Sequence, residues 1–257
     1  MESALKPKLY GFSTGSVTIK KKAVIDDGVG MVEMPIPAFL IVHPNGNVLF
    51  DTGLHSDLAD PTSERLGNLS KYSTIKFSME EHVVNRIATL GLKPEDISII
   101  INSHLHFDHA GGNCDFPNAT MIVQRAEMNA ATDPDLIVRN AFNPDDYKSN
   151  LKRKLIDGEH DVFGDGVLLL KPTPGHTPGH QCLLVTIDDR RILLAADASY
   201  IAENLERQMV SRLSFDIEAA KRSLAKLAEW KAEGWEIMIG HDLDQWSRVP
   251  KIPTPIV

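Results

Sequence analysis

The segment "IINSHLHFDHAGGN", residues 100–113, places three histidines and one aspartate within six positions, directly after an apolar run. These residues are His104, His106, Asp108 and His109. In an extended chain, alternate side chains point the same way, so the first two histidines can bind one ion together. If the chain turns just after them, the last two residues are directed toward a second point. The spacing therefore predicts a site for two metal ions that share a bridging hydroxide.

Further metal-binding side chains follow later apolar runs, at the ends of predicted strands. "TPTPGHTPGHQ" contains His176 and His180, "LLAADASY" contains Asp197, and "EIMIGHD" contains His241. Spacing alone does not choose between His176 and His180. Histidine and aspartate ligands without thiolates suit a catalytic zinc or a similar ion better than a closed structural site.

The bulk composition is that of a globular protein. The chain has 257 residues, of which 42% are hydrophobic and 24% charged, and its net charge is −8. An acidic balance disfavours nucleic acid, because phosphate contacts need a basic face, and suits a small neutral substrate. No apolar run approaches the ~20 residues of a membrane span. The start "MESALKPKLYGF" lacks the pattern of a signal peptide, so we expect a cytoplasmic protein. Cys114 and Cys182 are expected to be reduced thiols.

The order of predicted elements is strands, a helix, strands, and then the same again. Strands are expected at "KLYGFST", "SVTIKKKAVI", "AFLIVHP", "NVLFDTG", "DISIII", "TMIVQ", "VLLLKP", "QCLLVTI", "RILLAAD" and "EIMIGHD". Helices are expected at 79–90, where Ser78 and Glu81 form a capping box, at 125–131, and within 216–234, where Ile217 and Leu224 share the apolar face. Two sheets with helices packed outside would bury these elements in a single domain, 1–257.

The motif His-x-His-x-Asp-His, with His176, Asp197 and His241, resembles the ligand set of the metallo-β-lactamase superfamily. More narrowly, "SHLHFDHAGGN", "IVQRAE", "TPGHTPGHQ", "DASY" and "GHD" resemble the N-acyl-homoserine lactonases, which inactivate quorum-sensing signals. The resemblance covers nearly the whole chain. It implies an α/β fold, specifically the four-layer αββα sandwich with its metals at one edge.

The resemblance also implies a role for each candidate ligand. His104, His106 and His176 would hold one metal, Asp108, His109 and His241 the other, and Asp197 would bridge them. Both ions would be divalent, with zinc as the expected element. His180 is left with a supporting or structural role.

Tyr200 lies three residues after Asp197, where the lactonases carry a tyrosine whose hydroxyl points at the substrate carbonyl. Without the resemblance, it would be read as a core or rim aromatic with a satisfied hydroxyl. Asp51 in "LFDTG" has two interpretations that we weigh equally: a supporter of a metal ligand, or a turn residue that accepts backbone N–H bonds. His43, His55, His82 and His160 are expected to be ordinary surface or structural histidines.

The function that follows is hydrolysis of a lactone ring by the metal-bridging hydroxide. Tyr200 would stabilise the oxyanion and Asp108 would protonate the leaving alkoxide. Met31, Met34, Phe107 and Phe142 are candidates for an apolar groove that takes the acyl chain, although a core role is at least as plausible for each. Segments 55–78 and 132–162 are long and polar and are expected to be binding loops. If segment 55–78 also covers a neighbouring subunit, a homodimer follows.

Several other functions remain open on the sequence. The nearest are hydrolysis of another lactone or small ester, or of a thioester as in enzymes that resemble glyoxalase II. β-Lactam hydrolysis is disfavoured because those enzymes tend to use cysteine where Asp197 stands, and nuclease activity is disfavoured by the acidic charge. Diiron redox relatives have glutamate at the position of His106. A non-catalytic metal-binding module is the last alternative.

Overall fold

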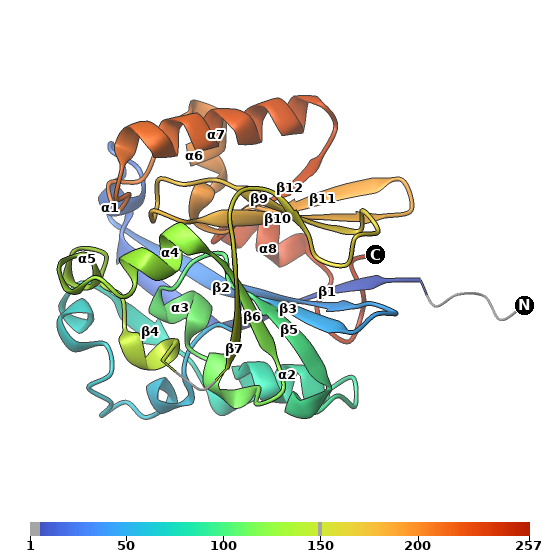
Figure 1. The fold of residues 1–257 in the computed structure, drawn as a ribbon. Coiled ribbons are helices and arrows are strands. Elements are labelled where there is room, and N and C mark those ends of the chain that lie inside the picture. Colours follow the sequence, from blue (N-terminus) through green and yellow to red (C-terminus); the bar gives the residue numbers. More distant parts are fainter. Residues whose placement is uncertain (1–5, 149–150) are drawn as a thin grey trace, which may run out of the picture.

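The computed structural model describes residues 6–148 and 151–257, which form two β-sheets flanked by helices (Figure 1). The larger sheet is mixed and has seven strands, in the spatial order β4 (Thr74–Lys76), β1 (Lys8–Lys20), β2 (Met31–Val42), β3 (Asn47–Phe50), β5 (Ile97–Ile101), β6 (Thr120–Gln124) and β7 (Lys152–Ile156). The smaller sheet has five, in the order β12 (Glu236–Met238), β11 (Arg190–Leu194), β10 (Gln181–Ile187), β9 (Leu168–Pro172) and β8 (His160–Asp161).

Eight α-helices accompany the sheets in the described residues. They are α1 (Lys21–Val24), α2 (Val83–Ala88), α3 (Phe107–Ala110), α4 (Arg125–Ala130), α5 (Pro134–Arg139), α6 (Ala202–Arg207), α7 (Ile217–Ala232) and α8 (Leu243–Arg248). In this part of the chain, no helix has the length and apolar character needed to cross a membrane.

The elements are stacked in four layers, which confirms the predicted αββα sandwich. α7 covers the outer face of the smaller sheet, and α2 covers the outer face of the larger one (Figure 1). The inner faces of the two sheets meet in one apolar cluster. Alternation along the strands produces this division: Leu183 and Val185 of β10 point into the cluster between the sheets, while Cys182 and Leu184 pack under α7.

Two of the predicted element boundaries and one predicted core position are wrong. The two strands predicted at the start are one strand, β1, with a register shift between Ser13 and Ser16, and the following "KKAV" is helical. The helix predicted over 79–90 is a 3₁₀ turn followed by the shorter α2, although the capping box of Ser78 and Glu81 is present. Ile217 of α7 is 40% exposed and does not belong to the apolar face, while Leu224 is buried as expected.

The two segments expected to be long loops contain short elements. Segment 55–78 includes β4, and segment 132–162 includes α5, β7 and β8. β7 pairs in parallel with β6 and forms the edge of the larger sheet, and β8 forms the edge of the smaller one. Their polar sequences do not show the alternation that identifies a half-buried strand, because they lie at sheet edges.

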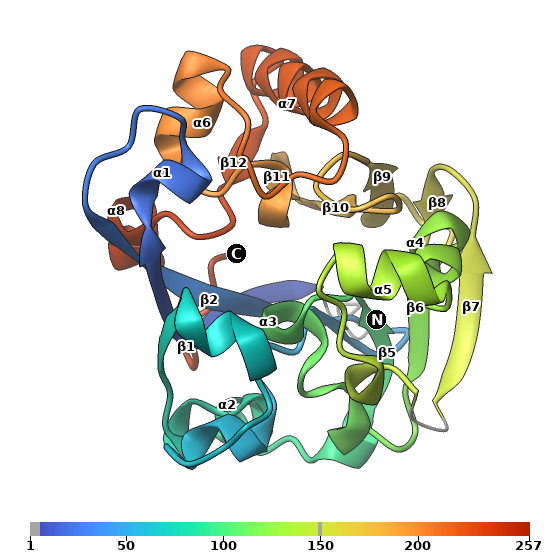
Figure 2. The same ribbon diagram turned by 90° about the vertical axis from the view of Figure 1, so that its left-hand side faces the viewer.

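The segments that follow several strands lie together at one edge of the sandwich. β3, β5 and β6 are parallel to one another, so the segments that follow them leave the larger sheet at the same edge. β11 and β12 are also parallel and do the same in the smaller sheet. Figure 2 looks onto this end of the molecule, where α3 lies among the surrounding loops. The polar residues that follow these strands are therefore brought together.

Candidate metal centre

The seven residues predicted from the sequence as metal ligands converge at this edge. They fall into three overlapping groups whose nitrogen or oxygen atoms lie within 4.8 Å of one another: His104, His106 and His176; His104, His109 and Asp197; and Asp108, His109 and His241. The described chain offers no other group of this kind.

The first group is a triangle of imidazole nitrogens. Nε2 of His104 lies 3.0 Å from Nδ1 of His106, and Nε2 of His176 lies 3.1 Å and 2.9 Å from these two atoms. His104 and His106 come from the segment after β5, and His176 comes from the loop between β9 and β10.

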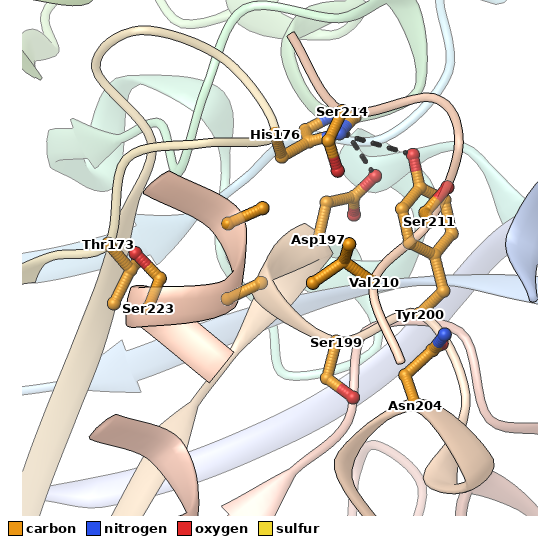
Figure 3. Close-up of a pocket in the computed structure, with 12 residues that line it drawn as sticks. Thr173, His176, Asp197, Ser199, Tyr200, Asn204, Val210, Ser211, Ser214 and Ser223 are labelled. Carbon is orange, nitrogen blue, oxygen red and sulfur yellow. Dashed lines mark hydrogen bonds and ion pairs between the residues drawn. The ribbon is translucent and has the colours of Figure 1, made fainter. Parts of the chain in front are cut away.

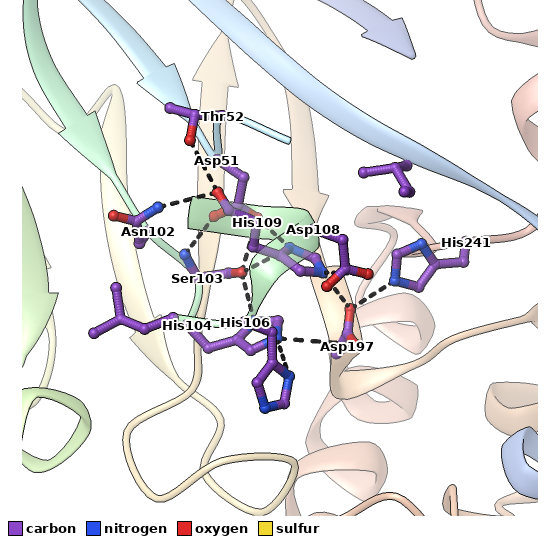
Figure 4. Close-up of polar contacts among 12 residues, drawn as sticks. Asp51, Thr52, Asn102, Ser103, His104, His106, Asp108, His109, Asp197 and His241 are labelled. Atoms are coloured by element: carbon purple, nitrogen blue, oxygen red, sulfur yellow. Dashed lines mark hydrogen bonds and ion pairs between the residues drawn. The ribbon is translucent and has the colours of Figure 1, made fainter. Parts of the chain in front are cut away.

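The second group lies on the other side of Asp197 (Figure 4). Oδ1 of Asp197 is 3.1 Å from Nε2 of His109 and 2.9 Å from Nε2 of His241. Oδ2 faces the first group, at 3.4 Å from Nε2 of His176 and 3.9 Å from Nε2 of His104. Asp108 lies at the rim, with Oδ2 3.8 Å from Nε2 of His109. The Asp197 carboxylate thus lies between the two groups, with one oxygen toward each.

The outer contacts of the first group determine which nitrogens carry protons. Nε2 of His106 donates to the carbonyl oxygen of Asn140 at 2.7 Å, so its Nδ1 must present a lone pair. The Ser103 hydroxyl donates to Asp51 at 2.8 Å and accepts from Nδ1 of His104 at 2.9 Å. Nε2 of His104 therefore also presents a lone pair to the centre. Burial lowers the pKa of His104 and His106, which keeps both rings neutral.

The second group is oriented in the same way. Nδ1 of His109 donates to Oδ2 of Asp51 at 2.8 Å, and Nδ1 of His241 donates to the carbonyl oxygen of Pro35 at 2.8 Å. In their neutral forms, both rings direct a lone pair at the Asp197 carboxylate, which is itself an acceptor. Burial lowers the pKa of His109, but Asp197, Asp108 and Asp51 outweigh burial and raise it.

This donor set fits divalent cations. Imidazole lone pairs and carboxylate oxygens converge, and the protons of the rings point outward to fixed acceptors. Facing acceptors repel one another unless a positive charge lies between them, and protonated rings or metal ions are the two sources of that charge. Hydrogen-bonded outer nitrogens are the usual arrangement for metal-binding histidines. Nitrogen and oxygen donors without thiolates are typical of catalytic zinc sites and their relatives.

Asp51 is a supporting residue and not only a turn residue. Its two oxygens accept hydrogen bonds from the backbone and hydroxyl of Ser103, at 2.7 Å and 2.8 Å, in addition to the bond from His109. Its backbone is left-handed, with φ of 59°, which turns the chain at the end of β3. Through these contacts Asp51 fixes His109 directly and His104 through Ser103 (Figure 4).

The remaining histidines lie outside the three groups. His180 is fully buried beside the rings of His104 and His176, at centroid distances of 5.3 Å and 6.0 Å, and its Nδ1 bonds the Thr173 hydroxyl at 2.9 Å. Burial lowers its pKa to about 3. His43 stacks on Phe163, and the others of this set, His55, His82 and His160, also lie outside the groups.

Sequence reasoning missed Glu127, whose carboxylate is completely buried close to the centre. It accepts hydrogen bonds from the backbone N–H of Leu105 at 3.0 Å and of Gly179 at 2.9 Å. Burial raises its pKa to about 7. The signal in the sequence was an acidic residue in the first turn of a helix directly after the apolar strand "TMIVQ".

Tyr200 lies beside the first group, with its hydroxyl oxygen 3.3 Å from Nδ1 of His176 (Figure 3). If Nε2 of His176 presents its lone pair to the centre, Nδ1 carries the proton and donates to the phenol oxygen. The phenol proton is then available to another acceptor. Burial, together with the charges of Asp197 and Asp108, raises the pKa of Tyr200, so the hydroxyl keeps this proton at neutral pH.

A cavity of about 340 Å³ is lined by Phe107, which lies between two of the candidate ligands in sequence, and by Phe142, whose ring centroid lies 5.4 Å from that of His106. Its walls come from segment 55–78, which contributes Leu58, Leu66 and Leu69, and from segment 132–148, which contributes Ile137, Val138 and Phe142. Phe107 and Phe142 line it as predicted. Met31 and Met34 do not line it: Met31 is exposed, and Met34 is buried in an apolar cluster.

Comparisons with known proteins point to one family. The Metallo-beta-lactamase superfamily matches residues 32–233. The N-acyl homoserine lactonase AttM of Rhizobium radiobacter is 33% identical over 255 residues, which cover 96% of this chain and 97% of AttM. An N-acyl homoserine lactonase of Bacillus cereus is 36% identical over 244 residues, which cover 93% of this chain and 94% of the relative.

Solved structures agree with these relatives. A quorum-quenching N-acyl homoserine lactone hydrolase has a TM-score of 0.84 and 32% identity, with 99% of this chain and 100% of that chain covered. A structure of an N-acyl homoserine lactone hydrolase with the product N-hexanoyl-L-homoserine at its catalytic metal centre has a TM-score of 0.82 and 32% identity, with 97% and 99% covered.

Proposed function

Because this chain belongs to the metallo-β-lactamase superfamily and, within it, to the N-acyl homoserine lactonases, we propose that its centre opens the lactone ring of N-acyl-homoserine lactones. Such an activity inactivates quorum-sensing signals. The observation that carries the proposal is the convergence of inward-directed imidazole nitrogens on the two oxygens of Asp197. The two relatives that match more than nine-tenths of this chain in sequence are lactonases by name.

The proposed ligands of the ions are the residues of the three groups, and the geometry supports this assignment. His104, His106 and His176 would hold one ion, and Asp108, His109 and His241 the other. Asp197 would contribute one oxygen to each. Zinc is the proposed element because it accepts nitrogen and carboxylate ligands in open, catalytic sites. When bound, two such ions lower the pKa of a shared water and polarise the carbonyl of an ester.

The chain's own residues complete the reaction. Hydrolysis of the lactone adds hydroxide to the carbonyl carbon, breaks the bond to the ring oxygen and delivers a proton to that oxygen. Tyr200 is the proposed donor to the carbonyl oxygen as negative charge develops there, and its retained proton and its bond from His176 support this role. Asp108, at the rim of the centre, is the proposed carrier of the proton to the departing oxygen.

The acyl chain is proposed to lie in the cavity beside Phe107. Apolar side chains from two segments line this cavity together with Arg65, Asn68 and Asn143, so burial of the acyl chain's methylene groups against the apolar part would contribute to binding. The acidic net charge of the protein agrees with a neutral substrate.

The proposal is tested by assaying N-hexanoyl- and N-decanoyl-homoserine lactone with the metal-loaded wild type, Asp108→Asn and Tyr200→Phe. We expect turnover by the wild type, and a loss of roughly 100-fold in kcat for Tyr200→Phe with metal content unchanged. Asp108→Asn should lose about 100-fold or more. Tyr72→Phe, at an exposed tyrosine in segment 55–78, is the matched control and should retain full activity.

The same preparation distinguishes the alternatives. A thioester and a phosphodiester are offered in parallel with the lactones. A wild type that hydrolyses the thioester but ignores both lactones would exclude the proposed substrate class and favour an activity like that of glyoxalase II.

A further inference from the structure

Glu127 is a buried carboxylate to which the proposed reaction assigns no part. It is the third residue of α4 and has no measurable exposed surface. Within residues 6–148 and 151–257, no ion pair compensates its charge, and its oxygens accept from two backbone N–H groups instead. Burial of a carboxylate without a cation is costly, so its position calls for an explanation beyond stability.

The two N–H groups belong to different loops. Oε1 accepts from Leu105, in the segment after β5, and Oε2 accepts from Gly179, in the loop between β9 and β10. The close approach depends on glycine, since a Cβ atom at position 179 would lie 2.2 Å from the backbone nitrogen of Glu127. One carboxylate therefore joins two loops that are distant in the sequence.

These two loops carry the whole first group of histidines. Leu105 lies between His104 and His106 in the sequence, and Gly179 lies three residues after His176. The second group is held by other contacts: His109 by Asp51, and His241 by the carbonyl oxygen of Pro35. Glu127 thus joins the two segments that carry the first group. It makes no hydrogen bond to Asp51 or Pro35, which hold the histidines of the second group.

We propose that Glu127 is a positioning residue that sets the separation of His104, His106 and His176, and thereby the affinity of this group for its metal ion. The inference rests on the proposed metal centre. It adds to it that one support, Glu127, contacts the segments of the first group alone, so that the affinity for this ion can be lowered while the other ion is retained.

Zn²⁺ titration of metal-free protein against a chromophoric chelator tests this proposal. The wild type should bind two equivalents tightly. In Glu127→Gln, the NH₂ group of the amide replaces one acceptor oxygen and faces a backbone N–H donor. The affinity for one Zn²⁺ ion should therefore fall by about 10- to 100-fold, while the affinity for the other is unchanged. NMR signals of the imidazole rings identify the weakened ion: those of His104, His106 and His176 should shift only at higher Zn²⁺.

A second variant and a control separate positioning from general stability. Gly179→Ala pushes the same loop away from Glu127 and should weaken the same ion. Asp146→Asn alters another fully buried carboxylate, outside the three ligand groups, and should retain both ions at wild-type affinity even if it unfolds at a lower temperature.

Two results would overturn the proposal: wild-type affinity for both ions in Glu127→Gln and Gly179→Ala, or an equal loss of both ions in these variants. A wild type that binds no Zn²⁺ at all would instead reject the metal centre, and the role of Glu127 with it.

Discussion

The carboxylate of Asp51 lies 2.8 Å from Nδ1 of His109, and this contact directs Nε2 of the same ring toward Asp197. The same carboxylate accepts two hydrogen bonds from Ser103, whose hydroxyl contacts His104. Asp51 is thus connected to a histidine of each group, in contrast to Glu127, whose contacts reach only the segments of the first. The difference leads to a prediction about metal binding.

Asp51→Asn should lower the affinity for both Zn²⁺ ions by about 10- to 100-fold, because the amide can no longer accept hydrogen bonds from His109 and Ser103 together. Competition with a chelator measures this loss. Asp188→Asn is the matched control, since Asp188 also has a left-handed backbone, with φ of 52°, but forms an ion pair with Lys6. If Asp51→Asn lowered the affinity for only one of the two Zn²⁺ ions, Asp51 would not connect the two groups.

Removal of the metal ions should destabilise the fold. Without a cation, imidazole lone pairs and the Asp197 carboxylate face one another in a buried centre, and binding of ions to the folded state alone stabilises it by mass action. At free Zn²⁺ concentrations about 1,000 times Kd, each ion contributes about 4 kcal/mol to the free energy of unfolding. Thermal unfolding of metal-free and metal-loaded protein measures the difference, and coinciding curves would contradict the prediction.

Val138→Trp should narrow the cavity beside Phe107 and discriminate against long acyl chains. Val138 lines the cavity but is 81% exposed, so a larger side chain there does not disturb the core. If the indole displaces about two methylene groups of the substrate, kcat/KM for the decanoyl lactone falls roughly tenfold. The hexanoyl lactone should be affected less, and Val138→Ala should leave the ratio between the two nearly unchanged. An equal effect on both substrates would place the acyl chain elsewhere.

Asp146 should make stability depend on pH. Burial raises the pKa of this carboxyl to about 6, despite the ion pair with Arg65, while the unfolded value is about 3.9. A raised pKa means that the contribution to stability is full below pH ~4 and is lost as the pH rises through 6. As the pH rises from about 4 to above 6, the free energy of unfolding of the wild type should therefore fall by up to about 3 kcal/mol relative to that of Asp146→Asn.

Chemical denaturation at several pH values measures that difference. Asp157→Asn, at an exposed aspartate that pairs with Arg125, provides the control and should show no such trend. A wild type that gained stability over Asp146→Asn as the pH rose would contradict the predicted sign.

Much of the fold could be predicted because its signals are local. The apolar runs "QCLLVTI" and "DISIII" predicted the strands β10 and β5. Boundaries and edge strands could not be predicted in this way. "KRKLI" forms β7 through parallel pairing with β6, and nothing in its own composition distinguishes it from a loop. The single domain over 1–257 and the homodimer stay predictions.

The sequence by itself identified the candidate ligands, because histidine and aspartate side chains follow the apolar runs that predict strands. It left open the choice between His176 and His180 and the role of Asp51, and it gave no role to Glu127. Tertiary structure brings His176, and not His180, into the first group, and it brings Asp51 and Glu127 into hydrogen-bond contact with the segments that carry the histidines. The direction of a ring proton depends on acceptors such as Asp51 and the carbonyl oxygen of Asn140, which come from distant segments, and no local pattern encodes such contacts.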